Sequence, residues 1–367
     1  MMDVWSGFLL SGPFGGSFSK VLLISAFLSW MITFVSRTLA LQFGIVAKRN
    51  GRRRHERDTP LLGGLAFYLV LSGVVLSRVL FRNYISQPEV HVQSEFAFWV
   101  AITLMFGIGV LDDFLELKAL PKFSVQIAAA VIVVFFQDTP LPIFDHLGIP
   151  LVLAIPLAVF CIVGITNAMN MIDGLDGLCS GLGAISALSL VAISLSSEGK
   201  ATPTAIILFA LAGCCVGFLF HNFNPAKIFL GDSGSLLIGF VLAVSAIQLN
   251  YGDSFFTSCA IPLLILGLPI VDVLFSIMRR VRMRRSVFQG DRSHIHHRLL
   301  QVGLSHRSVV LLLWICASYL GVTAYYLMQV PAQQSIFIYA SVVPTLFFWF
   351  LALFINLIVV CSFCMFA

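Results

Sequence analysis

The stretch FAFWVAITLMFGIGVLDD, residues 96–113, decides the fold of this chain. Sixteen residues without a charged side chain lead directly into two aspartates, Asp112 and Asp113. Such an apolar run favours a helix that crosses a lipid bilayer, because a helix pairs its backbone polar groups within the segment. Carboxylates are costly near lipid, so acids at the end of the run are candidates for function.

The same pattern of apolar runs and short polar breaks continues along the chain. Of its 367 residues, 59% are hydrophobic and 11% are charged, and the mean hydropathy is +0.98. This composition excludes a water-soluble surface and is typical of a membrane protein with several spans. We predict an all-α polytopic membrane protein in a single domain, 1–367, with about eleven transmembrane helices at 21–47, 61–81, 96–111, 123–136, 151–165, 178–196, 202–220, 234–249, 255–278, 309–330 and 335–363.

Lysine and arginine residues are distributed unequally between the two sides of these helices. Successive polar breaks must lie on alternate sides of the membrane. Assigned in this way, seventeen of the lysine and arginine residues lie on one side and three on the other, and two lie inside apolar runs. Cytoplasmic loops carry such an excess, so we predict the amino terminus outside and the carboxyl terminus in the cytoplasm. The net charge of +5 thus reflects topology, and nucleic acid is not an expected partner because no module for it is present.

The breaks on the basic side contain Asp112, Asp113, Asp173, Asp176, Asp232 and the polar segment 290–297. We expect the predicted cytoplasmic loops at about 48–60, 112–122, 167–177, 221–233 and 279–308 to form one active site. The breaks on the opposite side have the composition of ordinary connections. The topology therefore places a site for phosphate and metal on the cytoplasmic face.

Asp112 and Asp113 stand at the carboxyl end of a predicted helix. The helix dipole disfavours anions there by about 0.3 to 1 kcal/mol each, and adjacent carboxylates repel one another. A metal, Lys118 or Lys122 is therefore expected as compensation, and one aspartate of the pair suits general-base work. The alternative is a solvated helix end with both charges in water.

The segment NAMNMIDGLDGL, residues 167–178, contains two acids that are each followed by glycine. The glycines allow a tight turn that brings Asp173 and Asp176 toward one ligand, and Asn170 shares a helical face with Asp173. Oxygen ligands of this kind suit Mg²⁺ or Mn²⁺ bound together with substrate phosphates. The alternative is a helix-capping turn, with Asp173 or Asp176 as the N-cap.

A third acid, Asp232, lies in FLGDSGS, residues 229–235, just before an apolar run. It is well placed as an N-cap, and the free amides of a helix start also attract anions. Asn222 and Lys227 are near enough in sequence to contribute an amide and a positive charge. Capping and metal binding are compatible roles for Asp232.

The loop DRSHIHH, residues 291–297, combines His294, His296 and His297 with Arg292. Zinc needs about four nitrogen or sulfur ligands, and the cytoplasmic breaks contain no cysteine outside the apolar edges, so zinc is disfavoured. Imidazoles beside arginine suit hydrogen bonding to a diphosphate. A basic loop on anionic lipid headgroups would explain the arginines but not the three histidines.

These groups together predict a Mg²⁺-bound polyanion that meets a lipid at the cytoplasmic face. A phosphoryl-type transfer from a nucleotide-linked donor to a lipid acceptor fits this requirement. A divalent-cation transporter would place its acids within helices near the bilayer midplane. A CDP-alcohol phosphotransferase would concentrate them in one longer motif. Spacing alone does not name the reaction.

A family resemblance rests on the segments 54–64, 111–113, 167–178, 222 with 225–234, and 291–297. In this order, over roughly residues 45–300, they resemble the successive motifs of the polyprenyl-phosphate N-acetylhexosamine-1-phosphate transferases. The span count and the form His-Ile-His-His at 294–297 are closer to the WecA-type and TagO-type members than to the MraY translocase.

The resemblance implies transfer of a sugar 1-phosphate from a UDP-N-acetylhexosamine to undecaprenyl phosphate, with release of UMP, as the first step of cell-envelope polysaccharide synthesis at a bacterial inner membrane. UDP-GlcNAc is the first choice of donor, and an MraY-like reaction on UDP-MurNAc-pentapeptide is the alternative. Homodimer formation stays open. The implied roles are Asp112 and Asp113 at the lipid phosphate; Asp232 and Asn170 at Mg²⁺; and Lys122, Asp173, Asp176, Asn222, Arg292, His294, His296 and His297 at the substrates.

Overall fold

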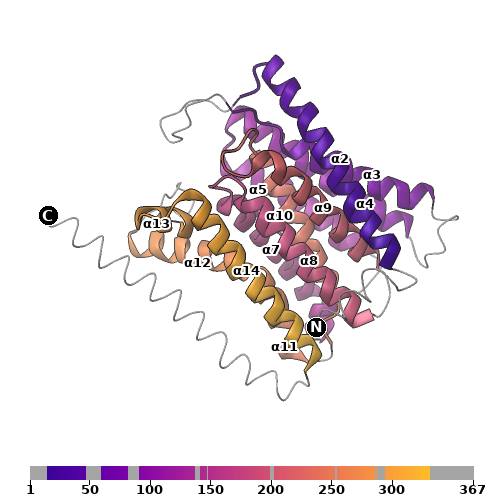
Figure 1. Ribbon diagram of the computed structural model, residues 1–367. Coiled ribbons are helices and arrows are strands. Elements are labelled where there is room, and N and C mark those ends of the chain that lie inside the picture. The colour runs from indigo at the N-terminus through magenta and orange to yellow at the C-terminus, as the bar shows by residue number, and fades with distance from the viewer. Residues whose placement is uncertain are drawn as a thin grey trace.

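The computed structural model describes residues 15–46, 59–81, 91–136, 141–146, 148–198, 202–252, 254–284, 286 and 294–330. Over these ranges the chain is helical, apart from turns and one isolated bridge between Val46 and Pro60. The predicted all-α fold is confirmed (Figure 1). The helices are α2 (Gly15–Gln42), α3 (Gly64–Leu80), α4 (Val92–Leu115), α5 (Ala119–Phe136), α6 (Pro142–His146), α7 (Leu151–Ile172), α8 (Leu178–Glu198), α9 (Pro203–Asn222), α10 (Gly231–Gln248), α11 (Phe255–Ile265), α12 (Gly267–Arg282), α13 (Ile295–Gln301) and α14 (His306–Gln329).

Several of these helices are long and apolar enough to cross a membrane. Among the described residues there are eight, namely α2, α4, α5, α7, α8, α9, α10 and α14, and a ninth if α11 and α12 form one span. Helix α3 is a shorter apolar helix of 17 residues. A multi-pass membrane protein is thereby confirmed. The count of eleven and the sides of the termini stay predictions, and the predicted span 335–363 lies outside the described residues.

The prediction of a single helix over 255–278 is wrong. The chain bends by 81° between α11 and α12, at Leu266. Pro269 has no N–H, so it cannot donate to the Ile265 carbonyl, which instead accepts a hydrogen bond from Ser186 Oγ at 3.3 Å. A proline in the first turn of α12 and Pro262 within α11 thus explain why the apolar run does not continue as one helix.

Helix α10 forms the centre of the bundle and packs against α4, α7, α3 and α8 (Figure 1). Nearly all of its side chains are buried. Close packing at its first turn depends on glycine, because a Cβ at Gly64 of α3 or at Gly109 of α4 would overlap Ser233. The start of α10 is therefore enclosed between the start of α3 and the last turns of α4.

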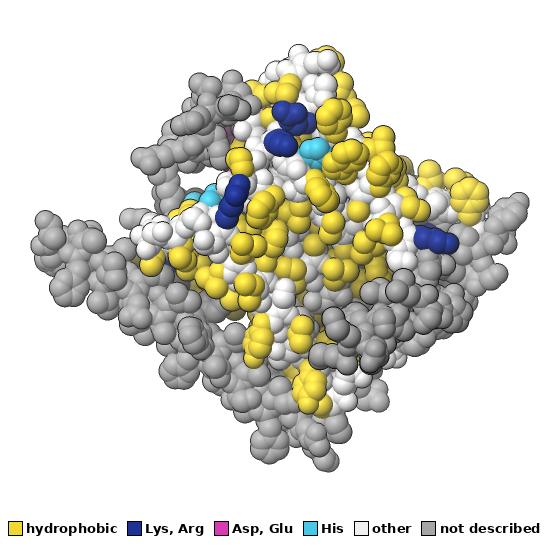
Figure 2. Space-filling view, viewed as in Figure 1, with side chains coloured by type: hydrophobic (Ala, Val, Ile, Leu, Met, Phe, Trp, Pro, Cys, Tyr) yellow, Lys and Arg dark blue, Asp and Glu magenta, His cyan; other side chains and the backbone are white. Residues whose placement is uncertain are grey.

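The outer surface is apolar where a bilayer would surround it. Figure 2 shows a face whose middle is covered by hydrophobic side chains, with a few basic ones toward its edges. On α12 the buried face carries the polar residues Asp272, Ser276 and Arg280, whereas Leu274 and Val281 are exposed. This reversal of the water-soluble pattern is expected when lipid is the solvent.

A buried ion pair joins the helices far from the first turn of α10. Arg78 Nη2 of α3 lies 2.6 Å from Glu95 Oε1 of α4, and Arg78 Nη1 donates to the Pro203 carbonyl at the start of α9 at 3.1 Å. Arg78 follows Gly64 by fourteen residues, which is roughly 21 Å along a helix at about 1.5 Å per residue. The pair thus fixes the opposite ends of these helices.

Candidate active site

Lys122 connects two carboxylates from distant parts of the chain. Its ammonium, in the first turn of α5, lies 2.6 Å from Asp112 Oδ2 in the last turn of α4 and 2.8 Å from Asp232 Oδ2 in the first turn of α10. The second Asp112 oxygen accepts from the Leu117 amide at 2.7 Å. The expected cation beside Asp112 is therefore Lys122.

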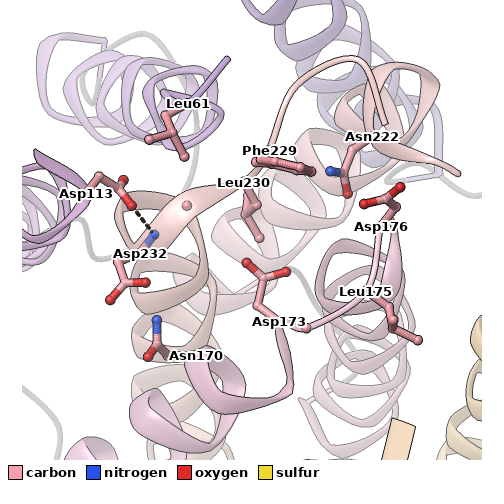
Figure 3. A pocket seen from close by; sticks show the side chains of 12 residues that line it. Leu61, Asp113, Asn170, Asp173, Leu175, Asp176, Asn222, Phe229, Leu230 and Asp232 are labelled. Atoms are coloured by element: carbon pink, nitrogen blue, oxygen red, sulfur yellow. Dashed lines mark hydrogen bonds between the residues drawn. The ribbon is translucent and has the colours of Figure 1, made fainter. Parts of the chain in front are cut away.

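Asp113 caps α10 from another helix. Its Oδ1 accepts from the Asp232 amide at 2.8 Å and its Oδ2 from the Ser233 amide at 3.2 Å, the first of which Figure 3 marks. The interpretation of Asp232 as the N-cap is wrong, because α10 begins at Gly231 and its N-cap Leu230 makes no side-chain cap. A carboxylate on the free amides of a helix start is favourable, and here it joins α4 to α10.

A pocket opens beside these residues (Figure 3). The amide of Asn170 lies beside the carboxylate of Asp232 on one side of the pocket, and Asn170 Nδ2 donates to Ser235 Oγ at 2.9 Å. Asp173 lies at the carboxyl end of α7, so the N-cap interpretation of Asp173 is wrong. The residues that line the pocket are Leu61, Asp113, Asn170, Asp173, Gly174, Leu175, Asp176, Asn222, Phe229, Leu230, Gly231 and Asp232.

Asp176 and Asn222 hold the far wall of the pocket in shape. Asp176 Oδ2 accepts from Asn224 Nδ2 and from the Ala226 amide, both at 3.0 Å. It precedes α8 by two residues, and no described contact makes it the N-cap. Asn222 Oδ1 accepts from the Gly177 amide at 2.9 Å, while its Nδ2 donates to the Ile228 carbonyl at 3.0 Å. These contacts tie the turn after α7 to the loop after α9.

The histidine segment lies on the other side of the turn at Gly174. His294 Nδ1 is 2.8 Å from Asp272 Oδ2, and the ring of His296 packs so closely on Gly174 that a Cβ there would overlap it. Burial lowers the pKa of His296 to about 3, since the imidazolium is poorly solvated there. His297 packs against His296, with ring centroids 4.3 Å apart. Arg292 lies outside the described residues.

Two features of the site escaped sequence reasoning. Asp272 lies inside an apolar run, and an ionisable residue in such a run is itself the signal that points to function. Gln126 and Asn167 form a pair between α5 and α7, in which Asn167 Nδ2 donates to Gln126 Oε1 at 2.5 Å. Gln126 lies one turn after Lys122, so this pair fixes the lysine relative to α7.

The donor set suits a hard cation. Among the described residues, no three His, Cys, Asp or Glu side chains are grouped closely enough to hold a metal alone. Mg²⁺ commonly takes one or two carboxylates and completes its shell with water and substrate phosphates. Asp232, whose side chain is 31% exposed, and the amide side chain of Asn170, which lines the same pocket, fit that kind of site.

Comparison with known proteins agrees with this geometry. Residues 96–250, which include both halves of the Asp113–Asp232 contact, match glycosyl transferase family 4. The probable undecaprenyl-phosphate N-acetylglucosaminyl 1-phosphate transferase of Bacillus subtilis (strain 168) is 36% identical over 317 residues, 84% of each chain. The chain belongs to glycosyl transferase family 4.

Other relatives of this glycosyl transferase are similar over most of their length. The decaprenyl-phosphate N-acetylglucosaminephosphotransferase of Mycobacterium tuberculosis (strain CDC 1551 / Oshkosh) is 37% identical over 330 residues, 83% of this chain and 80% of the relative. The undecaprenyl-phosphate alpha-N-acetylglucosaminyl 1-phosphate transferase of Escherichia coli (strain K12) is 30% identical over 323 residues, 84% of each. The predicted family resemblance is thus confirmed.

Proposed function

We propose that this protein transfers GlcNAc 1-phosphate from UDP-GlcNAc to undecaprenyl phosphate and releases UMP. A phosphate oxygen of the lipid becomes bonded to the phosphorus that carries the sugar. The bond between the two phosphates of the donor breaks, and UMP leaves with that bridging oxygen. The names of the related transferases support the acceptor and the transferred group.

The observation that carries the proposal is the arrangement of Asp112, Lys122 and Asp232 at the edge of the pocket. Two phosphate-bearing substrates need a positive charge between them, and an ammonium supplies it as a compact point charge. Lys122 is held by two carboxylates, so its position is set before any substrate arrives. Preorganised charge of this kind stabilises a transition state without reorganisation during the reaction.

A divalent cation is part of the proposal. Asp232 and Asn170 would hold Mg²⁺, with Mn²⁺ as a substitute, and Asp173 lies at the same pocket to orient water or substrate. Bound Mg²⁺ supplies positive charge that neutralises phosphate oxygens. The chain's own residues would orient the reactants: Lys122, beside Asp112, would contact the acceptor phosphate, and the turn at Asp173–Gly174, which lines the pocket, would contact the donor.

The proposal also includes a place in the cell. The charge distribution of the sequence favours the cytoplasmic face of a bacterial inner membrane, where a soluble UDP-sugar is available. The starts of α5 and α10 and the end of α4 meet at one end of the helices, as a site at a membrane face requires.

The test is UMP release by purified protein in detergent with UDP-GlcNAc, undecaprenyl phosphate and MgCl₂. Omission of the lipid, or addition of EDTA, is expected to abolish release. UDP-MurNAc-pentapeptide as the donor tests the alternative reaction. A folded protein that releases no UMP from any UDP-N-acetylhexosamine would contradict the proposal.

Asp232 is the residue on which the metal part of the proposal depends. Asp232→Ala is expected to reduce kcat by at least about 100-fold, in line with the loss of a group that supports transition-state charge. The residual activity should depend only weakly on Mg²⁺ concentration, because a ligand of the cation is gone. Titration of UMP release with MgCl₂ measures both effects, and near-normal kinetics would refute the role.

A further inference from the structure

Asp272 is a buried acid to which the proposed reaction assigns no task. It lies on α12 and is 5% exposed. Both of its oxygens are used by the histidine segment: Oδ2 lies 2.8 Å from His294 Nδ1, and Oδ1 accepts from the Ile295 amide at 2.8 Å. A carboxylate buried this deeply is costly unless it is paired, so this contact determines where the segment lies.

The contact extends from His294 to the next imidazole, that of His296. The rings of His294 and His296 are stacked, with centroids 5.8 Å apart and planes inclined by 4°. His296 is 1% exposed. Because Asp272 anchors both the ring of His294 and the amide of Ile295, it fixes the backbone on the amino-terminal side of His296.

His296 itself lies directly behind the wall of the pocket. It packs on Gly174, which lines the pocket next to Asp173. Neither ring nitrogen of His296 has a hydrogen-bond partner among the described residues. A buried imidazole without a partner is unfavourable by about 1 to 3 kcal/mol, so the ring does not hold this place by its own polar contacts. The anchors at His294 and Ile295 keep it against Gly174.

We propose that Asp272 is a positioning residue that, through His294 and Ile295, holds the imidazole of His296 against the turn at Gly174 and so sets the shape of the pocket wall that binds the sugar nucleotide. The inference rests on the proposed function for the identity of the ligand. Asp272 itself touches no substrate. Its loss is therefore expected to weaken the donor site while the acceptor side, at Asp112 and Lys122, stays unchanged.

Two variants separate the two contacts of Asp272. Asp272→Asn keeps an oxygen for the Ile295 amide but loses the carboxylate opposite His294, whereas Asp272→Ala loses both. Loss of the outer partner of a metal-ligating imidazole typically costs about 10- to 100-fold in affinity or activity, and the lower end of that range is the guide for a group that acts through a packing contact. We expect Asp272→Ala to raise KM for UDP-GlcNAc by about 10-fold or more, and Asp272→Asn to raise it less. KM for undecaprenyl phosphate should stay within about twofold of the wild type.

A merely structural role would not give this split between the two substrates. Glu95→Gln is the matched control, since Glu95 is also buried and paired but lies at the other end of the helices. It is expected to lower the thermal midpoint and leave both KM values unchanged. In a His294→Ala background, Asp272→Asn should have no further effect on the donor KM, because its route of action is already removed.

Binding of UDP, measured by calorimetry without lipid, separates this inference from the proposed function. Wild-type protein that binds UDP but releases no UMP would sink the reaction and still test Asp272. Equal UDP affinity in wild type and Asp272→Ala would overturn the inference. Equal increases of both KM values, or additive effects in the His294→Ala background, would also overturn it.

Discussion

Lys122 illustrates how much one side chain does at this site. It is 18% exposed and is the ammonium that separates Asp112 from Asp232. Without it, two carboxylates from different helices would repel one another across a partly buried junction. The two carboxylates use two of the three N–H donors of the ammonium, so one donor is left for a substrate phosphate. Lys118, four residues earlier and exposed, makes neither of these contacts.

Replacement of Lys122 by methionine keeps most of the volume and removes the charge. We expect kcat to fall by about 100- to 1,000-fold, which is typical for loss of one preorganised electrostatic group. Lys118→Met is the matched control and should retain wild-type activity. Rates of UMP release at saturating substrates check both variants. Equal activity of the two would mean that Lys122 is only a structural bridge.

The burial of His296 leads to a prediction about how the stability of the fold depends on pH. Its pKa is about 3 in the folded protein, against an ordinary 6.5. Between these two pH values the imidazole is protonated in the unfolded chain and neutral in the folded one. The neutral ring therefore contributes stability above pH 6.5 that is lost as the pH falls toward 3. Between about pH 8 and pH 5.5 the loss is roughly 1.4 kcal/mol. Thermal unfolding should show a smaller pH dependence in His296→Gln, and an unchanged dependence would contradict the assignment.

At the scale of elements, the start of α10 organises the site. Gly231 has a φ of +71°, in the left-handed region that glycine adopts without strain. A Cβ there would also stand 2.5 Å from Asp113 Oδ2. The tight turn thus lets a carboxylate of α4 reach the first free amides of α10. Two helices are joined at the point where the pocket begins.

Gly231→Ala is expected to lower stability more than an alanine substitution at a glycine that has a similar positive φ but no close neighbours. Gly252 provides that control, because it has a φ of +84° and a Cβ added there would have no atom within 4 Å. Gly252→Ala should cost about 1 kcal/mol. Gly231→Ala should cost more and also reduce UMP release, since Asp113 must move. Similar thermal midpoints and similar activities of the two variants would argue against the cap.

At the scale of the whole molecule, the bundle is fixed at both ends by charges. The site closes one end, and the buried pair of Arg78 and Glu95 joins α3 and α4 near the other. Arg78 also reaches the first turn of α9. A buried pair is sensitive to the loss of one partner, because the remaining charge is left uncompensated.

Glu95→Gln is accordingly expected to destabilise the protein by about 3 to 5 kcal/mol. Glu116→Gln, at an exposed position after α4, should be nearly neutral. Thermal unfolding in the same detergent measures both. A midpoint of Glu95→Gln equal to that of Glu116→Gln would show that the pair contributes no net stability.

The sequence predicted the parts of this molecule that depend on hydropathy and on local motifs. Apolar runs placed the helices, and acidic breaks located Asp112, Asp113 and Asp232 as one group. Contacts between segments that are distant in the chain could not be predicted from the sequence. That Asp113, rather than Asp232, supplies the cap depends on how α4 lies against α10. The bend at Leu266 was missed because a hydropathy pattern does not show that Pro269 has no backbone N–H to continue the helix.

The cap that Asp113 places on α10 has a consequence for biogenesis. A chain is synthesised from its amino terminus, so α4 and α5 enter the bilayer before the ribosome has made Asp232. Asp112, Asp113 and Lys122 are therefore synthesised first, and until α10 follows they have only one another as side-chain partners at this junction. The pocket is completed only when α10 arrives and docks its amides on Asp113. The central helix α10 is thus the last of the three helices α4, α5 and α10 to reach the junction. A nascent chain that ends before α10 has no assembled site.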